Sequence, residues 1–182
     1  MMNSIMEEIL SWVKALAIAL IIVLVVRQFL VTPSIVQGKS MEPNLHDGDR
    51  IILSKISKVN RFDEIAFRAP DADENYVKRV IGMPGDTIEM KDDTLYINGK
   101  AYEEPYLDSF KNQLEDGELL TNNFTLEEIT GESVVPSGYY FVLGDNRFIS
   151  KDSRVFGFIS EESIIGDVKM RIWPLQNFGI PK

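Results

Sequence analysis

The chain has 182 residues, an apolar content of 45% and a formal net charge of −9. This length suffices for one compact domain with an additional segment, and the apolar content is ordinary for a protein with a folded core. Cysteine is absent, which excludes a disulfide framework, a cysteine-based zinc site and a thiol nucleophile. The sequence has no basic stripe of the kind that nucleic-acid-binding surfaces need, so nucleic acid is not expected as a partner.

An almost continuous apolar segment runs from residue 9 to residue 31, after a short N-terminal tail of residues 1–8. As a helix with a rise of about 1.5 Å per residue it would span about 35 Å, which exceeds the hydrocarbon core of a bilayer at about 30 Å. We therefore predict a transmembrane anchor over residues 9–31. The polar residues within it are Ser11, Lys14, Arg27 and Gln28.

A cleaved signal peptide is the alternative for this segment, since it also places a basic residue before an apolar run. The run here is longer than a usual signal-peptide core, and it is followed by Pro33 rather than closed by a small-x-small triplet. Both features favour a retained anchor. Its orientation stays open under the positive-inside rule, because one basic residue lies near each end, Lys14 and Arg27.

Residues 32–182 consist of short β-branched or aromatic runs separated by Gly, Pro, Asn and Asp, which is typical of a mostly β domain. Met-Pro-Gly-Asp at 83–86 predicts a type II turn, and Asn-Gly at 98–99 predicts a two-residue hairpin. A helical turn is predicted for 160–164, and 106–114 is a candidate helix. The predicted strands are 50–56, 64–68, 75–81, 87–90, 94–97, 100–102, 139–143, 155–159 and 168–173.

A strongly acidic segment covers residues 101–135, where nine acidic side chains face a single base, Lys111. We interpret it as a solvated surface insertion between strands of the core, because a run of like charges is usually a solvent-exposed face. A specific cation site or a partner-binding patch is the alternative. The acidic residues are Glu103, Glu104, Asp108, Glu115, Asp116, Glu118, Glu127, Glu128 and Glu132.

Ser40 and Lys78 are the candidate catalytic pair. A serine hydroxyl is a weak nucleophile at its own pKa and needs a proton acceptor within hydrogen-bond reach. The only histidine, His46, lies beside a turn-like Asp-Gly-Asp segment and is predicted to be exposed. A neutral lysine amine is the other acceptor that such sites use. Taken alone, Ser40 is weak evidence, because most loop serines form turns.

Period-two alternation in the predicted strand 75–81 places Lys78 on one face with Tyr76 and Val80, and Arg79 on the other. If the Lys78 face is buried, desolvation lowers the pKa of the amine, which in documented buried lysines falls to about 5–6. Lys78 could then accept a proton from Ser40 near pH 7. In the alternative arrangement, Lys78 is exposed on an edge strand and Arg79 is the buried residue.

A third polar cluster follows the predicted buried strand 139–143. It reads Gly-Asp-Asn-Arg-Phe-Ile-Ser-Lys-Asp-Ser-Arg over residues 144–154. Its alternating acids, bases and hydroxyls could cap the strand with internal ion pairs, and one hydroxyl could orient a catalytic base. The two interpretations are compatible.

Together these segments resemble the bacterial type I signal peptidases, in the short form usual in Gram-positive bacteria. That family has, in order, a membrane anchor, a Ser-Met-x-Pro box, a Tyr-x-Lys-Arg-x-x-Gly-x-Pro-Gly-Asp box and a Gly-Asp-Asn-x-x-x-Ser-x-Asp-Ser-Arg box. This chain has all four, at residues 9–31, 40–43, 76–86 and 144–154. The resemblance implies a mostly β, signal-peptidase-like domain of antiparallel sheets preceded by one N-terminal transmembrane helix.

The resemblance also implies roles for individual residues. Ser40 would be the nucleophile that forms an acyl-enzyme, and Lys78 the general base that later returns the proton to the leaving amine. The Ser40 backbone N–H would supply one oxyanion donor. The supporting residues would be Ser150, hydrogen-bonded to the Lys78 amine, Arg79 paired with Asp145, Asp152 paired with Arg154, and Met41 in the substrate pocket.

Position 38 departs from the pattern of the Gram-negative members. Those proteins commonly have a serine two residues before the nucleophile, whose hydroxyl completes the oxyanion hole, whereas this chain has Gly38. Loss of one oxyanion donor costs about 2.7–4 kcal/mol in a measured case, so a backbone N–H or a water is expected to substitute for the hydroxyl.

The resemblance implies that the substrate is a preprotein whose signal peptide is still in the bilayer, cut after a small-x-small motif as an extended strand. The enzyme would be a single-pass protein of the cell membrane with an extracytoplasmic catalytic domain, working without metal, cofactor or nucleic acid. A self-cleaving repressor-type serine–lysine protease and a non-catalytic, membrane-anchored β domain that binds partners are the alternatives. The sequence predicts no oligomeric state.

Overall fold

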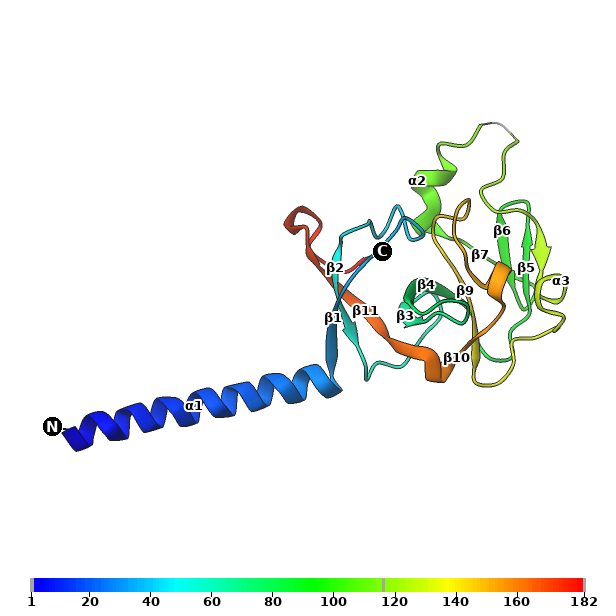
Figure 1. Cartoon of the computed structure of the whole chain (residues 1–182). Coiled ribbons are helices and arrows are strands. Elements are labelled where there is room, and N and C mark those ends of the chain that lie inside the picture. Colours follow the sequence, from blue (N-terminus) through cyan, green and yellow to red (C-terminus); the bar gives the residue numbers. More distant parts are fainter. Residues whose placement is uncertain (1, 116, 182) are drawn as a thin grey trace.

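A long helix projects from a β domain that contains the rest of the chain (Figure 1). This helix, α1 (Met2–Phe29), has an apolar part, Met6–Phe29, that is long enough to cross a bilayer and contains no residue buried in the protein. The computed structural model describes residues 2–115 and 117–181. Outside the described residues lie Met1, Asp116 of the acidic segment and Lys182.

The C-terminus of α1 is fastened to the β domain. Lys55 donates its ammonium group to the carbonyl oxygens of Gln28, at 2.9 Å, and Arg27, at 3.3 Å. Its backbone N–H also donates to the Leu30 carbonyl at 2.9 Å. A cation at a helix C-terminus pairs with carbonyl groups that lack a helical partner. The helix stops at Phe29 and β1 (Val31–Ile35) begins after one residue, whereas the anchor was predicted to extend to residue 31.

In the described part of the chain, the larger sheet has seven antiparallel strands in the order β1-β2-β11-β3-β4-β9-β10. Strand β1, which was not predicted, forms one edge. The late strand β11 lies between β2 and β3 and begins at residue 164, ahead of its predicted start at 168. The other bounds are β2 (Arg50–Ser54), β3 (Glu64–Arg68), β4 (Asn75–Gly82), β9 (Tyr139–Leu143), β10 (Ile159–Ser160) and β11 (Ile164–Trp173).

The smaller sheet has four strands in the order β7-β6-β5-β8 among the described residues. Asn98 and Gly99 both have positive φ, 54° and 74°, which confirms the predicted two-residue hairpin between β6 and β7. Gly85 has φ 88° and the Asp86 N–H donates to the Met83 carbonyl at 3.0 Å, as a type II turn requires. The bounds are β5 (Ile88–Lys91), β6 (Thr94–Ile97), β7 (Lys100–Tyr102) and β8 (Phe124–Thr125).

Strand β4 lies at the junction of the apolar clusters that make up the core. Val80 packs in a cluster with Phe67 of β3 and Val142 of β9, whereas the next residue, Ile81, packs in a cluster that includes Ile88 of β5. The second half of the strand is therefore buried on both faces, whereas its alternating pattern predicted only which residues share a face. This fixes the direction of the side chains that precede Val80 on the same strand.

Residues 155–159 were predicted as a strand, but only Ile159 lies in one, and residues 155 and 156 belong to a short helix. Asp152 caps a short helix, α4 (Ser153–Phe156), by accepting a backbone N–H of its first turn. A capped turn of this kind competes with the extended conformation, which explains the error. Only Ile159–Ser160 pairs as a strand, and the 3-10 turn that follows, η2 (Glu161–Ser163), lies within the predicted helical turn.

The acidic segment 101–135 is more than a solvated insertion. It folds into elements of its own and buries apolar side chains, among them Leu107, Leu120 and Phe124. Its described acidic residues are exposed except Glu104, which is 4% exposed, so the surface interpretation is wrong for that residue. Besides β7 and β8, the elements are η1 (Pro105–Leu107), α2 (Asp108–Lys111) and α3 (Leu126–Thr130).

Candidate active site

Ser40 begins a tight turn that follows β1. The Met41 carbonyl accepts the backbone N–H groups of Asn44, at 3.0 Å, and Leu45, at 2.9 Å. Met41 and Leu45 are fully buried and fix the turn to the core. The Ser40 carbonyl accepts the backbone N–H of Asn146 at 3.0 Å. Ser40 is therefore held from both sides while its side chain stays partly exposed.

Lys78 lies on β4, between β3 and β9, and is 3% exposed. Its Nζ lies 2.7 Å from Ser40 Oγ and 3.2 Å from the Val77 carbonyl oxygen. Arg79 is equally buried, so the alternative in which Lys78 is exposed and only Arg79 is buried is wrong. His46 is exposed, as predicted. The fold brings the predicted serine and lysine into hydrogen-bond contact.

Burial of Lys78 has an electrostatic consequence. Desolvation disfavours the ammonium form and lowers the pKa of Lys78 from 10.5 to about 8. The negative charges of Asp152 and Asp145 act in the opposite direction, but desolvation is the larger effect. With a pKa near 8, roughly a tenth of the amine is neutral at pH 7, compared with well under 0.1% for an unperturbed lysine.

Ser150 does not make the predicted hydrogen bond to the Lys78 amine. Its Oγ is buried and has no hydrogen-bond partner within the described residues, because the amine is directed at Ser40 and at a backbone carbonyl. Ser150 nevertheless lies in the site. A Cβ at Gly144 would stand 2.1 Å from Ser150 Oγ and 2.6 Å from the Ser40 carbonyl oxygen, so position 144 has no room for a side chain.

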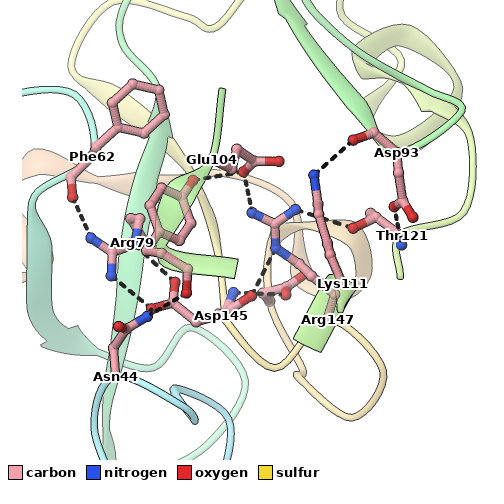
Figure 2. A network of polar contacts seen from close by, with 12 residues as sticks. Asn44, Phe62, Arg79, Asp93, Glu104, Lys111, Thr121, Asp145 and Arg147 are labelled. Atoms are coloured by element: carbon pink, nitrogen blue, oxygen red, sulfur yellow. Dashed lines mark hydrogen bonds and ion pairs between the residues drawn. The ribbon is translucent and has the colours of Figure 1, made fainter. Parts of the chain in front are cut away.

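Neighbouring residues of a strand point to opposite faces, so Arg79 points away from Lys78. Its side chain enters a buried polar network (Figure 2). Its Nε and Nη2 form a bidentate pair with Asp145 at 2.8 and 2.7 Å, which is the predicted pairing. Nη2 also reaches Glu64 at 2.7 Å, and Nη1 donates to the Phe62 carbonyl at 2.8 Å. Burial raises the pKa of Glu64 from 4.5 to about 7, although the Arg79 charge opposes the shift.

Asp152 and Arg154 also form the predicted pair. Arg154 Nε lies 2.8 Å from Asp152 Oδ1, and Arg154 Nη2 lies 2.8 Å from Asp152 Oδ2. Asp152 is fully buried. The same carboxylate accepts the Gly144 backbone N–H at 3.0 Å. Arg154 Nη2 donates further to the Arg147 carbonyl at 2.9 Å. The two ends of the 144–154 segment, which we call the catalytic loop, are thus tied together.

Gly38 adopts φ 80°, in the left-handed region that favours glycine. Its N–H donates to Asp47 Oδ1 at 2.7 Å and is engaged by that contact. A Cβ at position 38 would meet no atom within 4 Å, so the space beside it is open. The Ser40 N–H, in contrast, has no acceptor among the residues that the structure describes.

A cleft of about 750 Å³ opens beside Ser40 and Lys78. Residues of β1 and of the segment that follows it supply one part of its lining, and the first half of β4 supplies another. Met41, predicted in the substrate pocket, and Gly38, discussed above for the oxyanion hole, line it as well. Within the described chain, no group of three or more His, Cys, Asp or Glu side chains is arranged to hold a metal ion.

Four residues of the site were not singled out from the sequence: Asn44, Glu104, Tyr106 and Arg147. Asn44 Nδ2 donates to Asp145 Oδ2 at 2.7 Å and to the Tyr106 carbonyl at 3.0 Å, which joins the Ser40 turn to the catalytic loop. Asn44 directly follows the Ser-Met-x-Pro box, and this position was the sequence signal that could have identified it. Glu104 offered none, because it is one of nine similar acids in its segment.

Comparisons with known proteins agree with this geometry. Residues 9–173 match a family model described as "Signal peptidase, peptidase S26". A signal peptidase IB of Staphylococcus aureus (strain COL) is 42% identical over 94% of this chain and 93% of its own length. A signal peptidase I of Bacillus caldolyticus is 49% identical over 88% and 90%.

Among solved structures, that of a signal peptidase I from Enterococcus faecalis matches with a TM-score of 0.61 and 50% identity, covering 62% of this chain and 98% of the other. These matches, together with a serine–lysine contact on an antiparallel β domain, define a serine endopeptidase with an N-terminal apolar helix. The chain belongs to the signal peptidase family. The scaffold protein and the self-cleaving repressor-type protease are not favoured.

Proposed function

We propose that this protein removes N-terminal signal peptides from secreted preproteins, with Ser40 as nucleophile and Lys78 as general base. The observation that carries the proposal is the 2.7 Å contact between Lys78 Nζ and Ser40 Oγ at the wall of an open cleft. The names of the relatives, signal peptidase I and IB, supply the substrate class.

The reaction follows from the state of the amine. Neutral Lys78 accepts the hydroxyl proton as Ser40 Oγ attacks the scissile carbonyl carbon, and the Ser40 N–H donates to the oxyanion that forms. The Lys78 ammonium then protonates the leaving amine as the peptide bond breaks, which leaves an acyl-enzyme. Lys78, neutral again, removes a proton from a water that attacks the ester. It then returns that proton to Ser40 Oγ as the ester bond breaks, which releases the signal peptide and restores the enzyme.

The substrate binds as an extended strand in the cleft. Strand β1 is an edge of the seven-stranded sheet, so one side of its backbone is free to pair with an added strand. Both β1 and β4 contribute to the cleft lining, which supports a substrate strand that pairs with β1 next to Ser40. Alternate side chains of such a strand face the protein, as a small-x-small motif requires.

The protein is anchored by α1 as a single-pass protein of the cell membrane, with the β domain on the extracytoplasmic side. The apolar part of α1 is long enough to cross a bilayer and has no residue buried in the protein, which supports the anchor. Extracytoplasmic placement follows from the substrate, whose cleavage site emerges on that side. Exposed apolar side chains beyond β11, Leu175, Phe178 and Ile180, offer a second contact with the lipid surface.

Cleavage of a secretory preprotein by the full chain in detergent tests the proposal. Mass spectrometry should locate the cut directly after the small-x-small motif, and replacing the residue before the cut by a bulky one should abolish cleavage there. The proposed small-x-small motif requires a small side chain at that place. Cleavage at unrelated sites, or cleavage that is indifferent to the size of this residue, would contradict the proposal.

The pH dependence of cleavage gives a further prediction. Lys78 has to be neutral, and its pKa is lowered to about 8, so kcat/KM should rise with pH and level off above an apparent pKa near 8. Below that value, activity should fall about tenfold per pH unit, because the neutral fraction does so. Initial rates at low and at saturating substrate concentration over pH 6–11 give the pH profiles of kcat/KM and kcat, and hence the apparent pKa. An apparent pKa near 10 would show an unperturbed lysine.

A further inference from the structure

The acidic segment reaches the catalytic loop through one buried ion pair. Glu104 pairs with Arg147, and the two residues are 4% and 2% exposed (Figure 2). The Tyr106 hydroxyl also donates to Glu104 Oε1, at 2.6 Å. Replacing such a pair by apolar residues is often neutral or stabilising, so the pair is weak evidence for a contribution to stability. A role in placing other groups is the better explanation.

The other N–H groups of the Arg147 guanidinium donate to a backbone carbonyl and to a side-chain hydroxyl. Its Nε donates to the Gly144 carbonyl at 3.0 Å, and its Nη1 donates to Thr121 Oγ1 at 3.2 Å. The guanidinium is planar and its donors are fixed relative to one another, so holding two of them orients the third. Glu104 and Thr121, both from the acidic segment, thereby aim Nε at the backbone of the catalytic loop.

The same stretch of backbone holds the nucleophile. The Asn146 N–H donates to the Ser40 carbonyl at 3.0 Å, and a Cβ at Gly144 would approach that carbonyl oxygen to 2.6 Å. The two segments therefore touch backbone to backbone. A displacement of residues 144–146 has to move Ser40, whose Oγ lies 2.7 Å from Lys78 Nζ.

We propose that Glu104 is a positioning residue for the serine–lysine pair: through Arg147 it fixes the backbone of residues 144–146, and through that backbone it holds Ser40 against Lys78. The proposal rests on the proposed function, because it assigns Glu104 a part in that reaction. Glu104 and Arg147 do not line the cleft. Their effect should therefore fall on kcat and leave KM unchanged.

Glu104→Gln tests the first part of this chain of contacts. The amide cannot balance the Arg147 charge, so the guanidinium should turn toward water and release the Gly144 carbonyl. Misplacement of a reacting group by about 1 Å can cost about 10²-fold in rate, so kcat for preprotein cleavage should fall by about that factor with KM unchanged. Glu103→Gln is the matched control, since it removes the same charge from an exposed neighbour and should leave kcat at the wild-type value.

A double variant, Glu104→Leu with Arg147→Met, separates positioning from stability. The double variant leaves no unpaired buried charge, so its Tm should equal that of the wild type. Its kcat should stay about 10²-fold low, because no side chain then donates to the Gly144 carbonyl. Recovery of kcat together with Tm, or wild-type kcat in Glu104→Gln, would overturn the positioning role. A wild-type protein that fails to cleave preproteins would contradict the proposed function instead.

Discussion

Replacing Ser40 by alanine should lower kcat for preprotein cleavage by about 10⁴–10⁶-fold, and replacing Lys78 by methionine should have an effect of similar size. In the proposed mechanism the two side chains act as one unit, since the hydroxyl attacks only as its proton moves to the amine. The double variant should therefore be no slower than either single variant, because removing the second member of a unit costs little once the first is lost.

Two exposed residues provide matched controls for these substitutions. Ser109→Ala and Lys58→Met make the same chemical changes outside the cleft and should leave kcat and KM at wild-type values. Rates are best taken from single-turnover cleavage in detergent, which reports the chemical step without product release. Substantial activity in either Ser40→Ala or Lys78→Met would refute the assignment of that residue.

Lys78→Met should also make the folded protein more stable. A shift of the Lys78 pKa from 10.5 in the unfolded chain to about 8 in the native state corresponds to a cost of about 3 kcal/mol. Methionine has a similar length and no charge to desolvate. At pH 7, after loss of the contact with Ser40, the free energy of unfolding should therefore rise by about 2–3 kcal/mol.

The pH dependence gives this prediction its sign. Below pH 8 the lysine is charged in both states, so its full cost is present; between pH 8 and 10.5 the unfolded state binds the extra proton, and the cost disappears as pH rises. Urea unfolding of both proteins at pH 7 and pH 10.5 should show the gain at the lower pH only, with unchanged m-values. A Lys78→Met protein that is less stable than the wild type at pH 7 would show that desolvation is not the dominant effect.

The residues that the sequence identified share a local signal. Ser40, Lys78 and the Arg79–Asp145 pair lie in boxes whose residue order can be read directly, and strand alternation supplied a reason for the burial of Lys78. Alternation alone did not decide between Lys78 and Arg79. The structure shows that both are buried because β4 is covered on both faces, which depends on strands that come much later in the chain.

The features that the sequence missed depend on contacts between distant segments. Glu104 and Arg147 are 43 residues apart. Nothing local distinguishes Glu104 from its exposed neighbour Glu103. Residues 155–159 read as a strand from composition, but a side-chain cap at Asp152 outweighs that preference. The expected bond from Ser150 to Lys78 failed because side-chain direction, unlike strand identity, is set by atoms of the surrounding fold.

The fastening of α1 to the β domain gives the enzyme a fixed reach. Lys55 holds the helix end, one residue connects it to β1, and β1 is itself part of the cleft. The five residues of β1 extend about 16 Å. With α1 spanning the bilayer as proposed, the scissile bond would be met at a set height above the hydrocarbon edge. The distance between the bilayer and Ser40 would then select the cleavage site. A preprotein would be cut at the small-x-small motif that lies at that height, and other small-x-small sequences in it would be left intact.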